Sequence, residues 1–259
     1  MRWIFILLFT GALGFGLFQL WEGQQAALAH QMVRDSMDRF RPERVSGFSG
    51  VNHGDDSEAE KDSEESENAE EEPVFINQSI LDAQLIYPDM VGWLMLDGTA
   101  VDYPFVQAAD NDYYLRRDID GKNARAGTLF MDYRQNSDFT DFVSTIYGHN
   151  MRNGTKFSSL KHYAGAEFFE LNRFGTLFLA YATYEIEILA FMRVRNDNSM
   201  IFAVRDFDDI GRHEFIEYVK QNAIQLREFT MEEADRFVIL STCVNSAAEA
   251  RHVLIGRLR

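Results

Sequence analysis

The chain contains a single cysteine, Cys243, among its 259 residues. An intramolecular disulfide is therefore excluded, so an ordinary apolar core must hold the fold and the thiol stays chemically available. Groups of metal ligands are missing too, because the six histidines are scattered and none has metal-ligand spacing with the cysteine. There is also no glycine-rich phosphate loop, so we expect no metal and no cofactor.

Positive charge is scarce, with 25 lysines and arginines against 41 acidic residues and a net charge of −16. We find no basic patch, so no nucleic-acid partner is expected. Much of the excess negative charge lies in residues 55–72, where eleven acids and one lysine give a net charge of −10. This segment has no aromatic or branched aliphatic residue. Such a segment cannot bury enough apolar surface to order itself, which predicts a disordered linker.

Charge is absent altogether from residues 3–20. At about 1.5 Å per residue this run reaches about 27 Å, close to the roughly 30 Å of a bilayer core. Arg2 precedes it and Glu22 follows it, so the chain after about residue 22 should face outward. A cleavable signal peptide is the alternative, with residues 27–29 (ALA) as its cleavage site, but the long apolar run favours an uncleaved anchor.

These features divide the chain into three parts. Residues 1–21 are predicted to be an N-terminal transmembrane anchor, residues 22–73 a membrane-proximal stretch with the acidic linker, and residues 74–259 one extracellular domain. Apolar spacing in that domain predicts helices at 76–85, 156–171 and 210–226. Many short strands separated by turns predict a mainly β barrel or sandwich with these helices. The strands are expected at 91–96, 100–106, 127–132, 142–147, 176–184, 185–194, 236–242 and 251–258.

Cys243 is a candidate nucleophile because it ends the β-like apolar run 237–242 instead of lying within it. A thiol needs a nearby base or cation to ionise near neutral pH. Arg251 follows eight residues later, and His149 is the histidine that the sequence offers. A lone cysteine is more often a small buried apolar residue, but its place at a strand end favours the catalytic interpretation.

Six ordered segments make the chain similar to the class B sortases. They are YPDMVGWL at 87–94, GTAVDYP at 98–104, NDYYL at 111–115, GTLFMD at 127–132, YGHNM at 147–151, and LSTC at 240–243 followed by Arg251. The resemblance runs from about residue 80 to the end of the chain. It implies a closed eight-stranded β-barrel with N-terminal helices and a helix inserted between the sixth and seventh strands, where the helix at 210–226 is expected. That helix could form one wall of a substrate groove.

The resemblance also implies an activity, that of a membrane-anchored cysteine transpeptidase of Gram-positive bacteria. Such an enzyme cleaves a C-terminal sorting motif of surface proteins and joins the new carboxyl end to an amine of a cell-wall precursor or of a pilin. Cys243 would form the thioacyl intermediate, His149 would transfer protons, and Arg251 would donate hydrogen bonds to the substrate carbonyl or the oxyanion. The implied substrate-binding residues are Ser241, Thr242, Tyr147, Asn111 and Leu115.

Three other functions remain open from the residues alone. Water could resolve the same thioacyl intermediate in a hydrolytic cysteine peptidase, and a lysine side chain could resolve it in a pilin-polymerising enzyme. The third is an extracellular binding module in which Cys243 is merely structural. The joint presence of His149, Cys243 and Arg251 argues against this last function.

Overall fold

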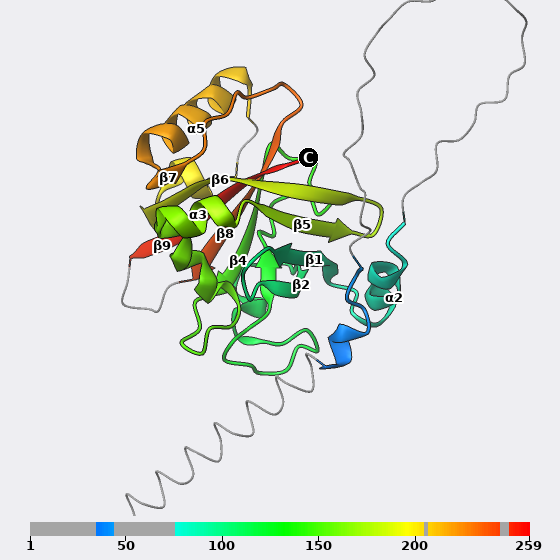
Figure 1. Cartoon of the computed structure of the whole chain (residues 1–259). Helices are drawn as coiled ribbons and strands as arrows, with labels where there is room; N and C mark the ends of the chain where they lie inside the picture. The colour runs from blue at the N-terminus through cyan, green and yellow to red at the C-terminus, as the bar shows by residue number, and fades with distance from the viewer. Residues whose placement is uncertain (1–34, 44–75, 205–206, 244–248) are drawn as a thin grey trace, which may run out of the picture.

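The computed structural model describes residues 35–43, 76–204, 207–243 and 249–259 (Figure 1). The predicted anchor at 1–21 and the acidic linker at 55–72 lie outside these residues, as does the predicted domain boundary at 74. Within the described ranges, no helix has the length and apolar character needed to cross a membrane.

Eight strands close into a mixed barrel, as the sequence predicts. Their order is β5-β1-β2-β3-β4-β8-β9-β6, and antiparallel pairing of β5 with β6 joins the two ends. The pairs β2–β3 and β4–β8 are parallel, and the other pairs are antiparallel. The barrel strands are β1 (Met90–Leu96), β2 (Asp102–Val106), β3 (Leu129–Met131), β4 (Val143–His149), β5 (Phe174–Leu179), β6 (Thr183–Arg195), β8 (Arg236–Cys243) and β9 (Ala250–Leu258). The short strand β7 (Gln225–Leu226) extends the sheet beyond β6.

Both faces of β8 are buried, which explains why its sequence is a continuous apolar run. Val238 and Leu240 belong to one core cluster, whereas Phe237 and Ile239 belong to a second cluster together with residues of α5 (Asp209–Asn222). Successive side chains of a strand point to opposite faces, so these alternating residues face the barrel interior and its helix-covered outside.

Helices and 3₁₀ helices connect the strands, with some differences from the predicted bounds. The predicted helix at 156–171 is two elements, η2 (Phe157–Ala164) and α3 (Ala166–Leu171), because Gly165 has an extended backbone. The predicted helix at 210–226 ends at Asn222, since residues 225–226 pair with β6 instead. The predicted strand at 176–184 is divided by a turn between β5 and β6. The remaining elements are α2 (Gln78–Ile86), η1 (Tyr113–Arg116) and α4 (Ser199–Phe202).

Helix α5 lies over the strand starts, where its apolar face meets an aromatic cluster. The Phe215 ring packs edge-on against Phe142, just before β4, at 6.0 Å between centroids, and also contacts Phe237 of β8 at 6.4 Å. The Tyr218 hydroxyl of α5 accepts from Asn198, which follows the end of β6, so the helix also contacts the segment after that strand. The expectation that this helix walls the substrate groove stays a prediction.

The N-terminal part of the described chain packs against the outside of the barrel near β1 (Figure 1). Residues 35–38 are helical, and Met37 and Phe40 join Ile80 of α2 in one buried cluster with Trp93 of β1. An ion pair of 2.5 Å between Arg41 and Asp102 adds a polar contact at its edge. This segment therefore forms part of the folded unit.

A buried ionic cluster occupies the barrel end opposite to His149 and Cys243. The Arg257 guanidinium lies 2.6 Å from Glu187 and 3.4 Å from Asp235, and all three side chains are almost fully buried. Burying a charge is costly unless it is paired, so these three groups hold one another in place. Asp235 thus provides a buried carboxylate remote from the candidate site.

Candidate active site

The parallel pairing of β4 with β8 brings His149 and Cys243 together. The register is continuous from Val143 opposite Phe237 to His149 opposite Cys243, the last pair at the ends of both strands. Neighbouring strands lie roughly 4.8 Å apart, so the two residues are adjacent although far apart in sequence. A histidine beside a cysteine is the arrangement that activates a thiol.

Arg251 lies on the next strand, at the same end of the barrel. Strand β9 pairs antiparallel with β8, and Ser241 lies opposite Val253. Continuing that register by two residues brings Arg251 level with Cys243. Adjacent strands β4, β8 and β9 therefore contribute the three residues that were predicted to be catalytic.

The half-buried His149 ring is oriented by a main-chain carbonyl. Its Nε2 lies 2.6 Å from the carbonyl oxygen of Leu115, in η1. Because a carbonyl oxygen can only accept, Nε2 carries the hydrogen, and a neutral ring keeps its lone pair on Nδ1. Leu115 was predicted as a substrate contact, and the structure places its main chain against the histidine. Nδ1 is therefore the atom through which His149 would give and take a proton.

Tyr147 and Asn111, two of the predicted substrate-binding residues, meet at one carboxylate. The Tyr147 hydroxyl and the Asn111 Nδ2 each donate to Oδ2 of Asp132, both at 3.1 Å. Asp132 follows β3 directly and is 0% exposed. Sequence reasoning missed this residue, although a carboxylate directly after a short apolar strand in the GTLFMD segment was the available signal.

Comparisons with known proteins show the family of the chain. No family model matches the chain. A sortase B from Listeria monocytogenes is 33% identical over 189 residues, which cover 71% of this chain and 75% of that protein. The chain belongs to the sortase B family. It is accordingly a cysteine transpeptidase of the cell surface.

Two solved structures show the same fold. A class B sortase of Streptococcus pyogenes involved in pilus biogenesis is 30% identical, with a TM-score of 0.64 over 69% of this chain and 96% of the other. Sortase B from Bacillus anthracis is 31% identical, with a TM-score of 0.63 over 71% of this chain and 85% of the other. This sortase thus shares the barrel and the order of its strands with enzymes of the class.

The remaining predicted substrate residues of this sortase, Ser241 and Thr242, are each 1% exposed. The Thr242 hydroxyl accepts from the backbone N–H of His252 at 3.2 Å, which ties β8 to β9. The Ser241 hydroxyl has no hydrogen-bond partner among the described residues. Both side chains are thus part of the wall that carries Cys243, and their predicted contact with substrate stays a prediction.

His252 is unsuited to serve as the base, as its position beside Arg251 predicts. Its ring contacts Phe191 at a tilt of 42°, with 5.6 Å between centroids, and Phe191 belongs to the barrel interior. Burial lowers the pKa of His252, and the charges of Arg193 and Lys161 lower it further. The ring is therefore neutral at pH 7 and faces away from the outer cluster that contains Val253.

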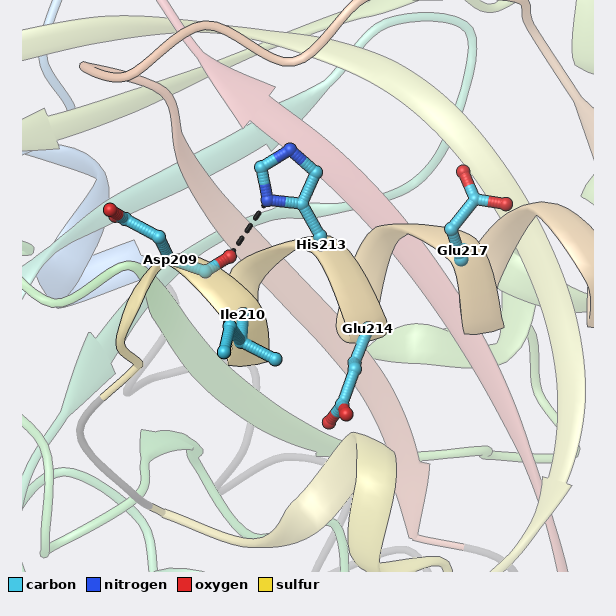
Figure 2. A pocket seen from close by; sticks show the side chains of 5 residues that line it. All are labelled: Asp209, Ile210, His213, Glu214 and Glu217. Carbon is cyan, nitrogen blue, oxygen red and sulfur yellow. Dashed lines mark hydrogen bonds between the residues drawn. The ribbon is translucent and has the colours of Figure 1, made fainter.

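A surface hollow lies on α5 (Figure 2). It is lined by Asp209, Ile210, His213, Glu214 and Glu217, all from one helix. The His213 Nδ1 contacts the Asp209 carbonyl oxygen at 2.7 Å, so its ring is engaged within the helix. None of the predicted site residues lines this hollow. Over the part of the chain that the structure describes, no group of three or more metal-ligating side chains comes together.

Gly127 controls the position of the Leu115 carbonyl. It has φ +57, and an added Cβ would lie 2.6 Å from the Leu115 oxygen and 2.7 Å from the Tyr114 oxygen. We expect Gly127→Ala to push η1 away from His149 and to lower kcat/KM about ten- to a hundredfold, since misplacement by 1 Å can cost about that much. Peptide cleavage kinetics measure this effect.

Gly154→Ala is the matched control for backbone strain. Gly154 also has positive φ, +86, but a Cβ there would meet no described atom within 4 Å. Both variants should lose stability from the left-handed conformation, Gly127→Ala more because of its close backbone contacts, and only Gly127→Ala should lose activity. Equal activity of the two variants would refute the role of the Leu115 carbonyl.

Proposed function

We propose that this sortase is a membrane-anchored transpeptidase that cleaves a C-terminal sorting motif of surface proteins through a thioacyl intermediate on Cys243. Residues 1–21 would span the membrane once and leave the barrel outside the cell. The new carboxyl end would pass to an amine of a cell-wall precursor. The observation that carries this proposal is the β4–β8 register, which aligns His149 with Cys243 beside Arg251 of β9.

In the first half-reaction, the Cys243 thiolate attacks the carbonyl carbon of the scissile peptide bond. Negative charge develops on the carbonyl oxygen, and the Arg251 guanidinium donates hydrogen bonds to it. As the C–N bond breaks, the His149 imidazolium gives its Nδ1 proton to the departing amine. The products are a thioacyl enzyme, a neutral histidine and the released C-terminal peptide.

In the second half-reaction, an amine attacks the thioacyl carbonyl carbon. Neutral His149 takes a proton from the attacking nitrogen at Nδ1, while Nε2–H remains on the Leu115 carbonyl. A new amide bond forms, the C–S bond breaks, and the Cys243 thiolate and the His149 imidazolium are restored. The cycle needs no metal or cofactor.

The proposed substrate contacts surround this centre. Tyr147 precedes His149 by two residues on β4, and Leu115 contacts the His149 ring through its carbonyl. Asn111 and Tyr147 both donate a hydrogen bond to Asp132. Ser241 and Thr242 precede the nucleophile on β8. Asn111, Leu115 and Tyr147 are partly exposed, so a peptide bound near Cys243 would contact these three more readily than the buried Ser241 and Thr242.

The test uses the full chain in detergent and peptides carrying NPQTN-, SPKTG- or LPXTG-like motifs, with and without triglycine. Mass spectrometry should detect one acyl adduct on the protein, and triglycine should remove it as an amide product. Cleavage with no transfer to any amine would instead identify a hydrolytic peptidase. An inert wild-type enzyme whose thiol also resists alkylation would contradict the catalytic proposal.

A pilin-polymerising enzyme is the second candidate, because the similar class B sortase of Streptococcus pyogenes is involved in pilus biogenesis. The two functions differ in the amine that resolves the intermediate. A lysine-containing peptide that outcompetes triglycine at equal concentration would favour polymerisation of pilins. Preference for triglycine would favour transfer to the cell wall.

A further inference from the structure

The Asp132 carboxylate is a fully buried anion that the chemistry described above does not use. It is 0% exposed and lies directly after β3. Its main chain is also fixed, since its N–H donates to Thr145 of β4 at 3.0 Å and its carbonyl accepts from Gln107 at 2.9 Å. A buried carboxylate is costly unless every lone pair meets a donor, so its partners explain its presence.

Arg134 supplies the countercharge. Its Nε donates to Oδ1 of Asp132 at 2.9 Å and its Nη2 donates to Oδ2 at 2.8 Å, a two-point contact. Burial by itself would raise the pKa of Asp132, but hydrogen bonds from Arg134 and its charge bring that pKa below the usual range. The carboxylate is therefore ionised throughout the neutral pH range and acts only as an acceptor.

Oδ2 of Asp132 also accepts hydrogen bonds from the side chains of Tyr147 and Asn111. The orientation of the Asn111 amide is determined, because its Oδ1 accepts from the Tyr133 N–H at 3.1 Å while its Nδ2 donates to Asp132. The Tyr147 hydroxyl hydrogen is likewise committed to Oδ2. One buried atom thus sets the direction of two partly exposed side chains from different segments.

We propose that Asp132 is a positioning residue for the sorting peptide, which acts by holding Asn111 and Tyr147 in their binding orientation. This inference rests on the proposed function of the same site. One Asn111 amide hydrogen is bound by Asp132, so the second has a defined direction in which it could donate to an acceptor of the peptide. The Tyr147 hydroxyl, whose hydrogen is taken, can meet a substrate only as an acceptor or through its ring. Asp132 would therefore act on peptide binding and leave the thiol chemistry unchanged.

The test compares Asp132→Asn with Asp235→Asn in the full-length protein. Asp235 is also a buried carboxylate paired with an arginine, but it lies at the other end of the barrel. We expect Asp132→Asn to raise KM for the acylating peptide at least tenfold, with kcat changed less than threefold. Iodoacetamide should alkylate Cys243 at the wild-type rate in both variants. Asp235→Asn should lower the melting temperature and leave KM unchanged.

A double-mutant cycle shows whether Asp132 acts through its partners. Tyr147→Phe and Asn111→Ala should each raise KM in the wild-type background and have little further effect in Asp132→Asn. Fully additive effects would overturn the proposal, as would equal changes in KM for the Asp132 and Asp235 variants. If Asp132→Asn does not fold, Arg134→Lys replaces it in the test. This variant keeps the positive charge but loses the two-point contact, so it should raise KM, by less than the tenfold expected for Asp132→Asn.

An NMR measurement separates this inference from the proposed function. The Asn111 side-chain amide hydrogen that Asp132 accepts should exchange slowly with water in the wild-type protein and in Asp235→Asn, and rapidly in Asp132→Asn. Unchanged exchange in Asp132→Asn would overturn the positioning role even if every peptide reacts. Failure of all peptides to react with the wild-type enzyme would refute the proposed function. The amide exchange would still show whether Asp132 positions Asn111.

Discussion

Cys243→Ala is expected to remove the acyl adduct completely and to lower peptide cleavage about 10⁴-fold or more, the scale of loss when a catalytic nucleophile is deleted. The physical reason is that the chain has no second cysteine to replace the lost thiol. Intact-protein mass spectrometry with a reactive sorting peptide measures the adduct, and product analysis measures the residual rate.

The matched variants for this prediction are Cys243→Ser and Ser241→Ala. A serine hydroxyl at position 243 is a much weaker nucleophile than a thiolate, so Cys243→Ser should also fail to turn over. Ser241→Ala removes a neighbouring buried hydroxyl that is proposed to contact the peptide and not to attack it, so this variant should still form the acyl adduct at saturating peptide even if KM rises. An adduct that persists in Cys243→Ala would show that another residue is the nucleophile.

His149→Gln is expected to lower kcat for amide substrates about 10²- to 10⁴-fold, the usual contribution of general acid–base catalysis. The glutamine amide keeps an N–H that can donate to the Leu115 carbonyl, but it cannot transfer a proton. The lesion is therefore chemical and leaves the local hydrogen bond in place. Single-turnover acylation, followed by mass spectrometry, measures the loss.

The leaving group provides the control for this prediction. In a peptide thioester with the same motif, the leaving group is a thiolate, which departs without being protonated. His149→Gln should therefore be acylated much faster by the thioester than by the amide. Iodoacetamide alkylation across pH separates a second effect, because a loss of thiolate would slow both substrates equally. Equal losses for thioester and amide, with wild-type alkylation, would contradict the general-acid role of His149.

Local sequence patterns predicted most of the strands, because buried strand positions are occupied by apolar residues. Strand β8 is buried on both faces, and its unbroken apolar run predicted its bounds to within one residue. The helix at 156–171 was predicted as one element because apolar spacing does not register the break at Gly165. The helix at 210–226 was predicted four residues too long, since apolar spacing does not show that residues 225–226 pair with β6.

Sequence patterns predicted some residues of the candidate site and missed others. The motifs selected Cys243, His149 and Arg251, and the strand register then aligned them on β4, β8 and β9. Leu115 was predicted through its side chain, whereas its carbonyl makes the observed contact with the His149 ring. Asp132 was missed, because a charged residue after a short apolar run is equally typical of an exposed turn.

The sequence by itself determined the chemistry available to this protein, namely one thiol at a strand end, a histidine and an arginine within the motifs of a sortase, and the many short apolar strands that build a barrel. The tertiary structure alone decided which groups orient them. The Leu115 carbonyl, Gly127 and the Asp132 carboxylate act through hydrogen bonds and close contacts between segments distant in sequence. Such contacts depend on how the chain closes in space, which local patterns of side chains do not encode.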